Sequence, residues 1–477
     1  MIKIGTSGFR GIDGKNFDSN VVKIIAQATC DIIKKHKYKK EVFVGFDKRK
    51  HSRLYAHDMC RVLVANKIKT FLCPYAEPSP LLSFAGKIRK NDLTLMVTAS
   101  HNEYAYNGIK IFGRGGSDLS SEIEIEFDTL VQQVDLSKVK IISWQQCQNN
   151  PLFALKNIEE EYVSSIISQI AYNPNGGNFL FETMGGSSAH TAKLLAKKMK
   201  GVHIYVNNIE SAHNTPILAP IPTKENLTHL KGLINKLGCR FAFATDGDGD
   251  RLAVVTPDGK YHDGTEIATL IYYFAIKYKN ENGGFVGNQS YSLLARYLCN
   301  KLDKNYYESR VGYKFIAQSM NENNVNFGSE NSSLCVKTHT PFKDGLLAFA
   351  LLIEVVCHKD FENKSLNEII ADIKEFCKYH MEYIEKSFKF DANTSHEEIL
   401  AKMDSFVPHI AGLKTRQNLD GNIKYIFEND CWAMLRLSGT ENSIRIISEQ
   451  PSEEENNKLI NNIISQFERY AGIKVKK

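Results

Sequence analysis

The chain has 477 residues, of which 43% are hydrophobic and 24% are charged, and its formal net charge is +6. This length predicts several globular domains, and so small a net charge argues against nucleic-acid or membrane-surface binding. The longest apolar runs, IATLIYYFAI and GLLAFALLIEVV, are shorter than the ~20 residues that span a bilayer, and the start of the chain lacks a signal-peptide pattern. The ten cysteines are scattered, which argues against a disulfide or zinc framework, so we expect a cytoplasmic protein.

Short β-rich runs that end in polar, glycine-containing loops alternate with amphipathic helical stretches over most of the chain. In chain order these runs are EVFVGFDKRKHS, LTLMVTASHN, NFLFETMGGSS, RFAFATDGDGDR, GGFVGNQS and NVNFGSENSS. The alternation predicts α/β units on largely parallel sheets, whose ligands gather at the carboxyl ends of the strands. The carboxy-terminal part instead holds consecutive strand-like runs, IKYIFEND, CWAMLRLS and SIRIISEQ, before a final helix, which predicts a separate α+β domain.

Changes in composition predict where one domain ends and the next begins. A polar, loop-like stretch runs from Trp144 to Pro151, a second break follows Arg251, and a third lies near CHKDFENKS. We therefore expect domains at residues 1–146, 147–252, 253–372 and 373–477.

The sharpest chemical signal is DGDGDR, which places Asp246, Asp248 and Asp250 at alternate positions. Carboxylates this close repel one another unless a cation neutralises them, and oxygen ligands select Mg²⁺ or Ca²⁺. An EF-hand is excluded, because its sixth and twelfth positions are occupied by Arg251 and Pro257. A solvated acidic turn remains the alternative.

The run TASHNEYAYNGIK follows a strand-like segment and contains a candidate nucleophile, Ser100. A nucleophilic hydroxyl needs a partner that removes its proton, and His101 and Lys110 are the candidates. The chain has neither the G-x-S-x-G elbow of a serine hydrolase nor the G-x-x-x-x-G-K-[ST] loop of a P-loop kinase. A turn with a capping serine is the alternative to a catalytic role.

Three further loops carry groups that bind anions or sugars. RLSGTENSIR, from Arg436 to Arg445, offers two guanidinium groups, two hydroxyls and a glycine turn, which suit a phosphate dianion. GSENSS has a carboxylate and hydroxyls able to bind sugar hydroxyls, and GTSGFRG places Arg10 in a glycine-rich turn. Each of these loops taken alone is also a common turn.

The five motifs GTSGFRG, TASHN…NGIK, DGDGDR, GSENS and RLSGTE occur together and in this order along the whole chain. This set resembles the α-D-phosphohexomutases, the family of phosphoglucomutase, phosphomannomutase and phosphoglucosamine mutase. The resemblance implies four domains around a central cleft, with three related α/β domains on mixed sheets and a carboxy-terminal α+β domain. It implies exchange of a phosphoryl group between an enzyme serine and a sugar phosphate through a hexose 1,6-bisphosphate, which must turn end over end.

The resemblance also implies roles for the residues around the reacting group. Ser100 is implied to cycle as phosphoserine, and one of its phosphoryl oxygens joins Asp246, Asp248 and Asp250 in holding Mg²⁺. The catalytic group is completed by Arg10, His101, Lys110 and Arg251, with Lys110 the favoured acid or base and Arg251 beside the metal loop.

The remaining motif residues are implied to bind the substrate. Glu330 and Ser332 match the Glu-x-Ser that grips sugar hydroxyls, and Tyr313 and Lys314 lie in the loop that senses the sugar. The phosphate that is not transferred is implied to be held by Arg436, Ser438, Gly439, Thr440, Asn442 and Arg445.

The sugar loop departs from the family pattern, since Ser329 precedes Glu330 and Ser333 replaces a glycine, and Asn442 stands where many members have proline. The Gly-Tyr-Lys of the sensing loop is more similar to glucose-type members. We therefore expect a glucose or mannose phosphomutase, with glucosamine or pentose phosphate as the alternative substrate and a non-catalytic sugar-phosphate binder as the alternative class. Its partners are expected to be small sugar phosphates, with the chain a monomer or homodimer.

Overall fold

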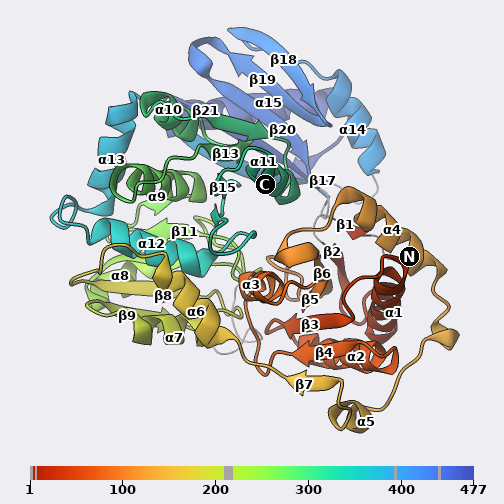
Figure 1. Ribbon diagram of the computed structural model, residues 1–477. Helices are drawn as coiled ribbons and strands as arrows, with labels where there is room; N and C mark the ends of the chain where they lie inside the picture. Colours follow the sequence, from red (N-terminus) through yellow and green to blue (C-terminus); the bar gives the residue numbers. More distant parts are fainter. Residues whose placement is uncertain (1–3, 6–7, 209–218, 391–394, 439–441, 477) are drawn as a thin grey trace.

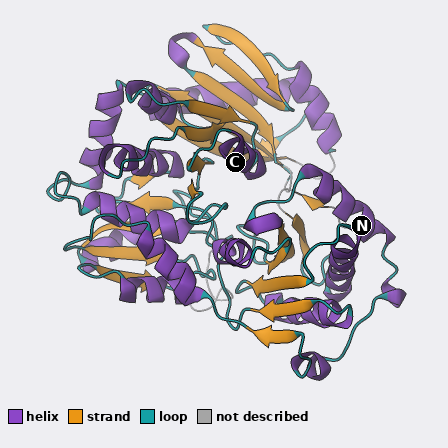
Figure 2. Ribbon diagram, viewed as in Figure 1, coloured by secondary structure: helices purple, strands orange, loops and turns teal. Residues whose placement is uncertain are grey.

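The computed structural model describes residues 4–5, 8–208, 219–390, 395–438 and 442–476. They form four sheets, each packed with its own helices (Figure 1). Each sheet with its helices is called a unit, numbered from one to four in chain order, and the four units lie around the centre of the molecule (Figure 1). Helices lie against the first three sheets, which are mixed, whereas the fourth sheet is antiparallel with helices to one side (Figure 2). This arrangement confirms the predicted fold class.

The first sheet has the order β1-β2-β6-β5-β3-β4-β7, in which β3, β4, β5 and β7 are parallel. Every residue of β3 is buried, as expected of a central strand covered on both faces. The strands are β1 (Ile4–Gly5), β2 (Gly8–Ile12), β3 (Glu41–Phe46), β4 (Lys69–Leu72), β5 (Thr94–Val97), β6 (Tyr106–Phe112) and β7 (Phe153–Leu155). The helices are α1 (Ser19–Lys35), α2 (Ser52–Ala65), α3 (Ser79–Arg89), α4 (Ser121–Gln133) and α5 (Trp144–Gln148).

The second and third sheets have the orders β12-β11-β10-β8-β9 and β14-β13-β15-β16. The second comprises β8 (Asn178–Glu182), β9 (His203–Asn207), β10 (Cys239–Ala244), β11 (Ala253–Val255) and β12 (Tyr261–His262), with α6 (Glu159–Ser168), α7 (Ala189–Lys198) and α8 (Leu230–Leu237). The third comprises β13 (Phe285–Asn288), β14 (Tyr306–Ser309), β15 (Phe327–Ser329) and β16 (Cys335–Val336), with α9 (Gly264–Tyr278), α10 (Leu293–Lys301), α11 (Tyr313–Glu322), α12 (Gly345–Val356) and α13 (Leu366–Cys377).

The fourth sheet has the order β18-β19-β20-β21-β17-β22 and every described pair in it is antiparallel. Its strands are β17 (Glu382–Phe390), β18 (Leu413–Leu419), β19 (Asn422–Phe427), β20 (Trp432–Leu437), β21 (Ser443–Gln450) and β22 (Val475–Lys476). The helices are α14 (His396–Ser405) and α15 (Glu453–Ala471), and α15 buries one apolar stripe against the sheet.

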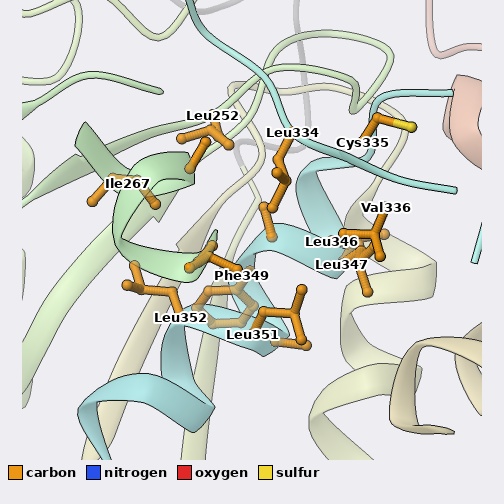
Figure 3. Packing of buried hydrophobic residues seen from close by; sticks show 14 of the residues in the cluster. Leu252, Ile267, Leu334, Cys335, Val336, Leu346, Leu347, Phe349, Leu351 and Leu352 are labelled. Carbon is orange, nitrogen blue, oxygen red and sulfur yellow. The ribbon is translucent and has the colours of Figure 1, made fainter. Parts of the chain in front are cut away.

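Helix α12 joins the second and third units through their shared core (Figure 3). All twelve of its residues are buried, and the ring of Phe349 lies 5.0 Å from that of Phe181 and 5.4 Å from that of Phe243, both on the second sheet. The buried carboxylate of Glu354 accepts hydrogen bonds from the backbone N–H of Ala171 and from Lys279. The apolar run GLLAFALLIEVV is therefore a core helix, and among the described residues none of the helices has the length and apolarity that crossing a bilayer requires.

The sheets extend beyond the domain boundaries expected at residues 146 and 252. Strand β7 pairs with β4 of the first sheet. In the second sheet β11 pairs with β10, and β12 pairs with β11. The expected third boundary at residue 372 falls inside α13. The reason is that these strands have only two or three residues, so their alternation of side chains is too short to be distinguished from a loop.

Candidate active site

Loops from all four units meet at one open cavity, at the carboxyl ends of β5, β10, β15 and β20. The cavity has a volume of about 970 Å³, which includes the part at its mouth that is open to solvent. The sequence-predicted residues that line it are Arg10, Ser100, His101, Lys110, Asp250, Arg251, Tyr313, Glu330, Ser332, Arg436, Ser438 and Arg445. Residues spread from one end of the chain to the other therefore face one space.

Ser100 lies in the loop between β5 and β6 and is buried, with a backbone φ of 53°. Its hydroxyl donates to Asp246 Oδ2 at 3.1 Å, across 146 positions of sequence. A left-handed conformation costs a residue with a side chain about 1–3 kcal/mol and occurs preferentially at functional sites. The neighbouring His101 lies with Nδ1 3.4 Å from the serine oxygen.

The three aspartates of the loop after β10 bring their carboxylate oxygens within 4.8 Å of one another, and all three are buried. Asp246 Oδ1 accepts the backbone N–H groups of Asp250 and Arg251. Asp248 Oδ1 and Asp250 Oδ1 are buried and find no hydrogen-bond partner among the described residues. Such orphaned oxygens are costly unless they bind a cation, so the aspartates fit Mg²⁺ or another oxygen-seeking divalent ion.

The ionisation of these groups is strongly coupled to their surroundings. Burial, with Asp250 and Asp248 next in effect, raises the pKa of Asp246 to about 8. Burial acts in the same direction on Asp248, but Lys110 overcomes it and holds the pKa of that carboxyl below its usual range. A divalent cation would relieve the same repulsion that raises the pKa of Asp246.

Lys110, on β6, donates to Asp248 Oδ2 and to Asp250 Oδ2, at 2.6 Å in each case. Burial lowers the pKa of this lysine, but the two carboxylates outweigh that effect and raise its pKa above the ordinary value. Conversely, burial and the charge of Arg251 lower the pKa of His101 well below its usual value, which favours the neutral imidazole. Arg251 donates to His101 Nδ1 at 2.9 Å, which orients the ring beside Ser100.

The opposite wall of the cavity is built from the third and fourth units. Glu330 follows β15 and accepts from Lys343 Nζ at 3.0 Å. Arg436 and Arg445 face each other on the paired strands β20 and β21, so two guanidinium groups stand side by side at this wall. The arrangement offers a carboxylate to a sugar and concentrated positive charge to a phosphate.

The structure does not bring every predicted substrate residue to the cavity. Lys314 instead forms an ion pair with Glu124 on α4, at 2.5 Å, and so joins α11 to the first unit. Asn442 is exposed, and its Oδ1 lies 3.0 Å from Nε2 of His396. Gly439 and Thr440 lie outside the described residues.

Comparison with known proteins identifies the family. Residues 1–137, 160–259 and 263–376 match the models of phosphoglucomutase/phosphomannomutase alpha/beta/alpha domains I, II and III, respectively. The chain belongs to the phosphoglucomutase/phosphomannomutase family.

Similar proteins are named for different sugar phosphates. A phosphoglucomutase/phosphomannomutase of Thermococcus kodakarensis is 25% identical, with 94% of this chain and 95% of that one covered. A phosphopentomutase of the same organism is 24% identical, with 98% of both covered, and a phosphoglucosamine mutase of Aliarcobacter butzleri is 24% identical, with 98% and 100% covered. The solved structure of a phosphoglucomutase/phosphomannomutase family protein from Burkholderia thailandensis shares the fold with a TM-score of 0.79, at 18% identity over 98% of this chain and 97% of that one.

Two positively charged side chains at or next to this site, those of Arg49 and Lys343, were not among the sequence-predicted residues. Arg49, after β3, is buried and donates to four main-chain oxygens of the serine loop. Lys343, before α12, lines the cavity, and its Nζ lies 3.7 Å from Asp250 Oδ1. Arg49 stands in the run FDKRKHS between two lysines, so only the polar end of a predicted strand indicated its position.

Proposed function

We propose that this protein interconverts hexose 1-phosphates and hexose 6-phosphates, with glucose and/or mannose as the sugar, through phosphorylated Ser100. The observation that carries the proposal is the contact of 3.1 Å between Ser100 Oγ and Asp246. It joins a hydroxyl held in a strained loop to an oxygen-only cation site from another unit. Phosphoryl transfer depends on such positioning and on neutralisation of charge more than on covalent chemistry.

In the proposed first half-reaction, a free hydroxyl of the sugar phosphate attacks the phosphorus of phosphoserine 100. The bond from phosphorus to the sugar oxygen forms as the bond to Ser100 Oγ breaks, and the product is a hexose 1,6-bisphosphate. Lys110 holds a proton beside the serine loop and is the favoured donor to the departing serine oxygen. The imidazole of His101, which lines the same cavity, is the candidate that accepts the proton of the attacking sugar hydroxyl. Mg²⁺ bound by the three aspartates would supply positive charge that stabilises the transferring group.

The second half-reaction returns the other phosphoryl group of the bisphosphate to Ser100. The intermediate has to turn end over end, so each of its phosphates is held in turn at the far wall of the cavity. Arg436 and Arg445 supply the charge for that contact, and Ser438 supplies a hydroxyl. Glu330, fixed by Lys343, is placed to accept hydrogen bonds from sugar hydroxyls.

The sugar is tested by coupled assays with glucose, mannose, glucosamine and ribose 1-phosphates, each primed with the matching bisphosphate. We expect the highest kcat/KM with glucose or mannose 1-phosphate. A preference for glucosamine or ribose 1-phosphate would keep the chemistry and overturn the sugar, in line with the names of the relatives above. Binding of these compounds without turnover of any would indicate a non-catalytic sugar-phosphate protein. We propose a cytoplasmic location, where such phosphates are metabolised.

A further inference from the structure

Helix α3 of the first unit begins directly against the loop that carries Asp246, Asp248 and Asp250. Ser79 is its first residue, and Ser79 Oγ donates to Asp248 Oδ2 at 2.5 Å. The backbone N–H of Ser79 donates to the main-chain oxygen of Asp248 at 2.7 Å. Both residues are fully buried, and they come from different units, 169 positions apart in sequence.

We propose that Ser79 is a positioning residue for the metal: it sets the orientation of the Asp248 carboxylate so that Oδ1 faces the ion. This inference rests on the metal role proposed for the three aspartates. Asp248 Oδ2 accepts from two donors, Ser79 Oγ and Lys110 Nζ, whereas Oδ1 has no hydrogen-bond partner in the part of the chain that the structure describes. A carboxylate held at one oxygen by two donors cannot rotate to exchange its oxygens, so the unpaired oxygen keeps one direction.

The surroundings of Ser79 also fix the loop that carries Asp248. Gly249 has a φ of +79°, and a side-chain carbon added there would lie 2.7 Å from Cβ of Pro78, so the loop packs directly on the start of the helix. The amino end of α3 carries partial positive charge, which favours the carboxylate of Asp248 in this place. Preceding Pro78, Glu77 accepts from Thr191 of α7 at 3.0 Å, so this segment is anchored to the second unit on both sides.

Ser83 provides a matched control one helical turn further along α3. Its hydroxyl is equally buried and donates to the main-chain oxygen of Gly116 at 2.6 Å. The same hydroxyl lies 2.8 Å from the side-chain hydroxyl of Thr340. Ser79→Ala and Ser83→Ala therefore each remove one buried, hydrogen-bonded hydroxyl from the same helix. Only Ser79→Ala removes a donor to a metal-binding carboxylate.

The test is titration of the full-length protein with Mn²⁺ in the absence of sugar, followed by electron paramagnetic resonance of the free ion. Loss of a group that orients a metal ligand typically weakens binding by about tenfold or more. We expect Ser79→Ala to bind Mn²⁺ at least about tenfold more weakly than the wild type. Ser79→Thr, which keeps the hydroxyl, should recover most of the affinity. Ser83→Ala should bind Mn²⁺ as tightly as the wild type, even if its melting temperature falls as much as that of Ser79→Ala.

Equal Mn²⁺ affinities for Ser79→Ala and Ser83→Ala would overturn the inference, as would a Ser79→Thr variant that folds normally and binds as weakly as Ser79→Ala. Asp248→Asn separates this inference from the function on which it rests. If Asp248→Asn abolishes Mn²⁺ binding and Ser79→Ala does not weaken it, the positioning role alone is wrong. If Asp248→Asn binds Mn²⁺ normally, the metal site and the inference both fall.

Discussion

Arg49 donates from Nη2 to the main-chain oxygen of Ser100 at 2.7 Å. The same guanidinium also binds the main-chain oxygens of Asn102, at 2.7 Å, Glu103, at 2.7 Å, and Tyr106, at 2.9 Å. One planar group with donors in fixed directions therefore holds the whole loop in which Ser100 adopts its left-handed conformation.

Arg49→Lys should lower kcat by about 100-fold, because an ammonium cannot reach four oxygens at once and a misplacement of about 1 Å costs that much. Steady-state kinetics with the preferred sugar phosphate would measure this, and KM should change less. Arg61→Lys is the control, since Arg61 also binds a carboxylate and a main-chain oxygen in the first unit but lies away from the serine loop. A kcat of Arg49→Lys equal to that of the wild type would show that the serine loop keeps its conformation without the Arg49 guanidinium.

Ser100→Ala should lose at least about 10⁴-fold in kcat, because the phosphoryl acceptor is removed while the binding groups remain. Phosphopeptide mass spectrometry after incubation with the bisphosphate should find the label at Ser100 in the wild type and no label in the variant. Ser137→Ala, at an exposed serine of the first unit, should behave as the wild type. Turnover near normal in Ser100→Ala would refute the nucleophile.

Mg²⁺ should raise the melting temperature of the wild type, since an ion that binds only the folded state stabilises it by about 2.7 kcal/mol at 100 times its Kd. In Asp246→Asn the response to Mg²⁺ should be lost. The same variant should be at least as stable as the wild type in EDTA above pH 8, because the amide replaces a carboxylate whose ionisation its neighbours oppose. Thermal unfolding with Mg²⁺ and with EDTA checks both, and an unchanged Mg²⁺ response would contradict the assignment.

Lys343→Met should lower kcat/KM by about 100-fold, a loss similar to removing one electrostatic contact from other active sites. The lysine forms an ion pair with Glu330 and lies 3.7 Å from Asp250. Its loss leaves Glu330 without that ion pair and leaves Lys110 as the lysine that still contacts Asp250, where anionic substrate binds. Lys337→Met is the control, because that lysine is in the same unit but is not part of the cavity lining, and its Nζ donates to the main-chain oxygen of Met320 at 3.4 Å. Equal kcat/KM values in the two variants would exclude a role for Lys343.

Glu77 should make stability fall as pH rises. Burial, with Glu159 next in effect, raises the pKa of Glu77 from 4.5 to about 9. The folded protein therefore keeps a proton that the unfolded chain releases, so stability is fully present below pH 4.5 and is lost between pH 4.5 and about 9. Glu77→Gln should remove a slope of up to about 1.4 kcal/mol per pH unit, seen in melting temperatures from pH 5 to 8.5.

The exposed Glu375→Gln is the control for Glu77→Gln and should leave the pH dependence unchanged. A Glu77→Gln variant whose melting temperature still falls with pH as steeply as that of the wild type would locate the titrating group elsewhere.

The sequence could indicate candidate residues that the structure brings together where those residues lie within contiguous motifs. Ser100 and the three aspartates are recognisable because a strand end followed by hydroxyls or carboxylates has few structural explanations. Arg49 could not be distinguished from Lys48 and Lys50, because its role comes from oxygens 51 to 57 positions away. Lys314 was predicted to bind substrate, but the contact with Glu124 depends on how α11 meets the first unit, which no local pattern shows.

Helix α12 limits how this molecule can be divided. Its apolar side chains are shared between two sheets, and Phe349 lies among the phenylalanines of the second. A fragment that ends before α12 would expose that aromatic surface to water. A fragment that begins at residue 253 would carry the helix without Phe181, Phe241 and Phe243 of the second sheet. We therefore expect the second and third units to fold as one cooperative body rather than as separable modules.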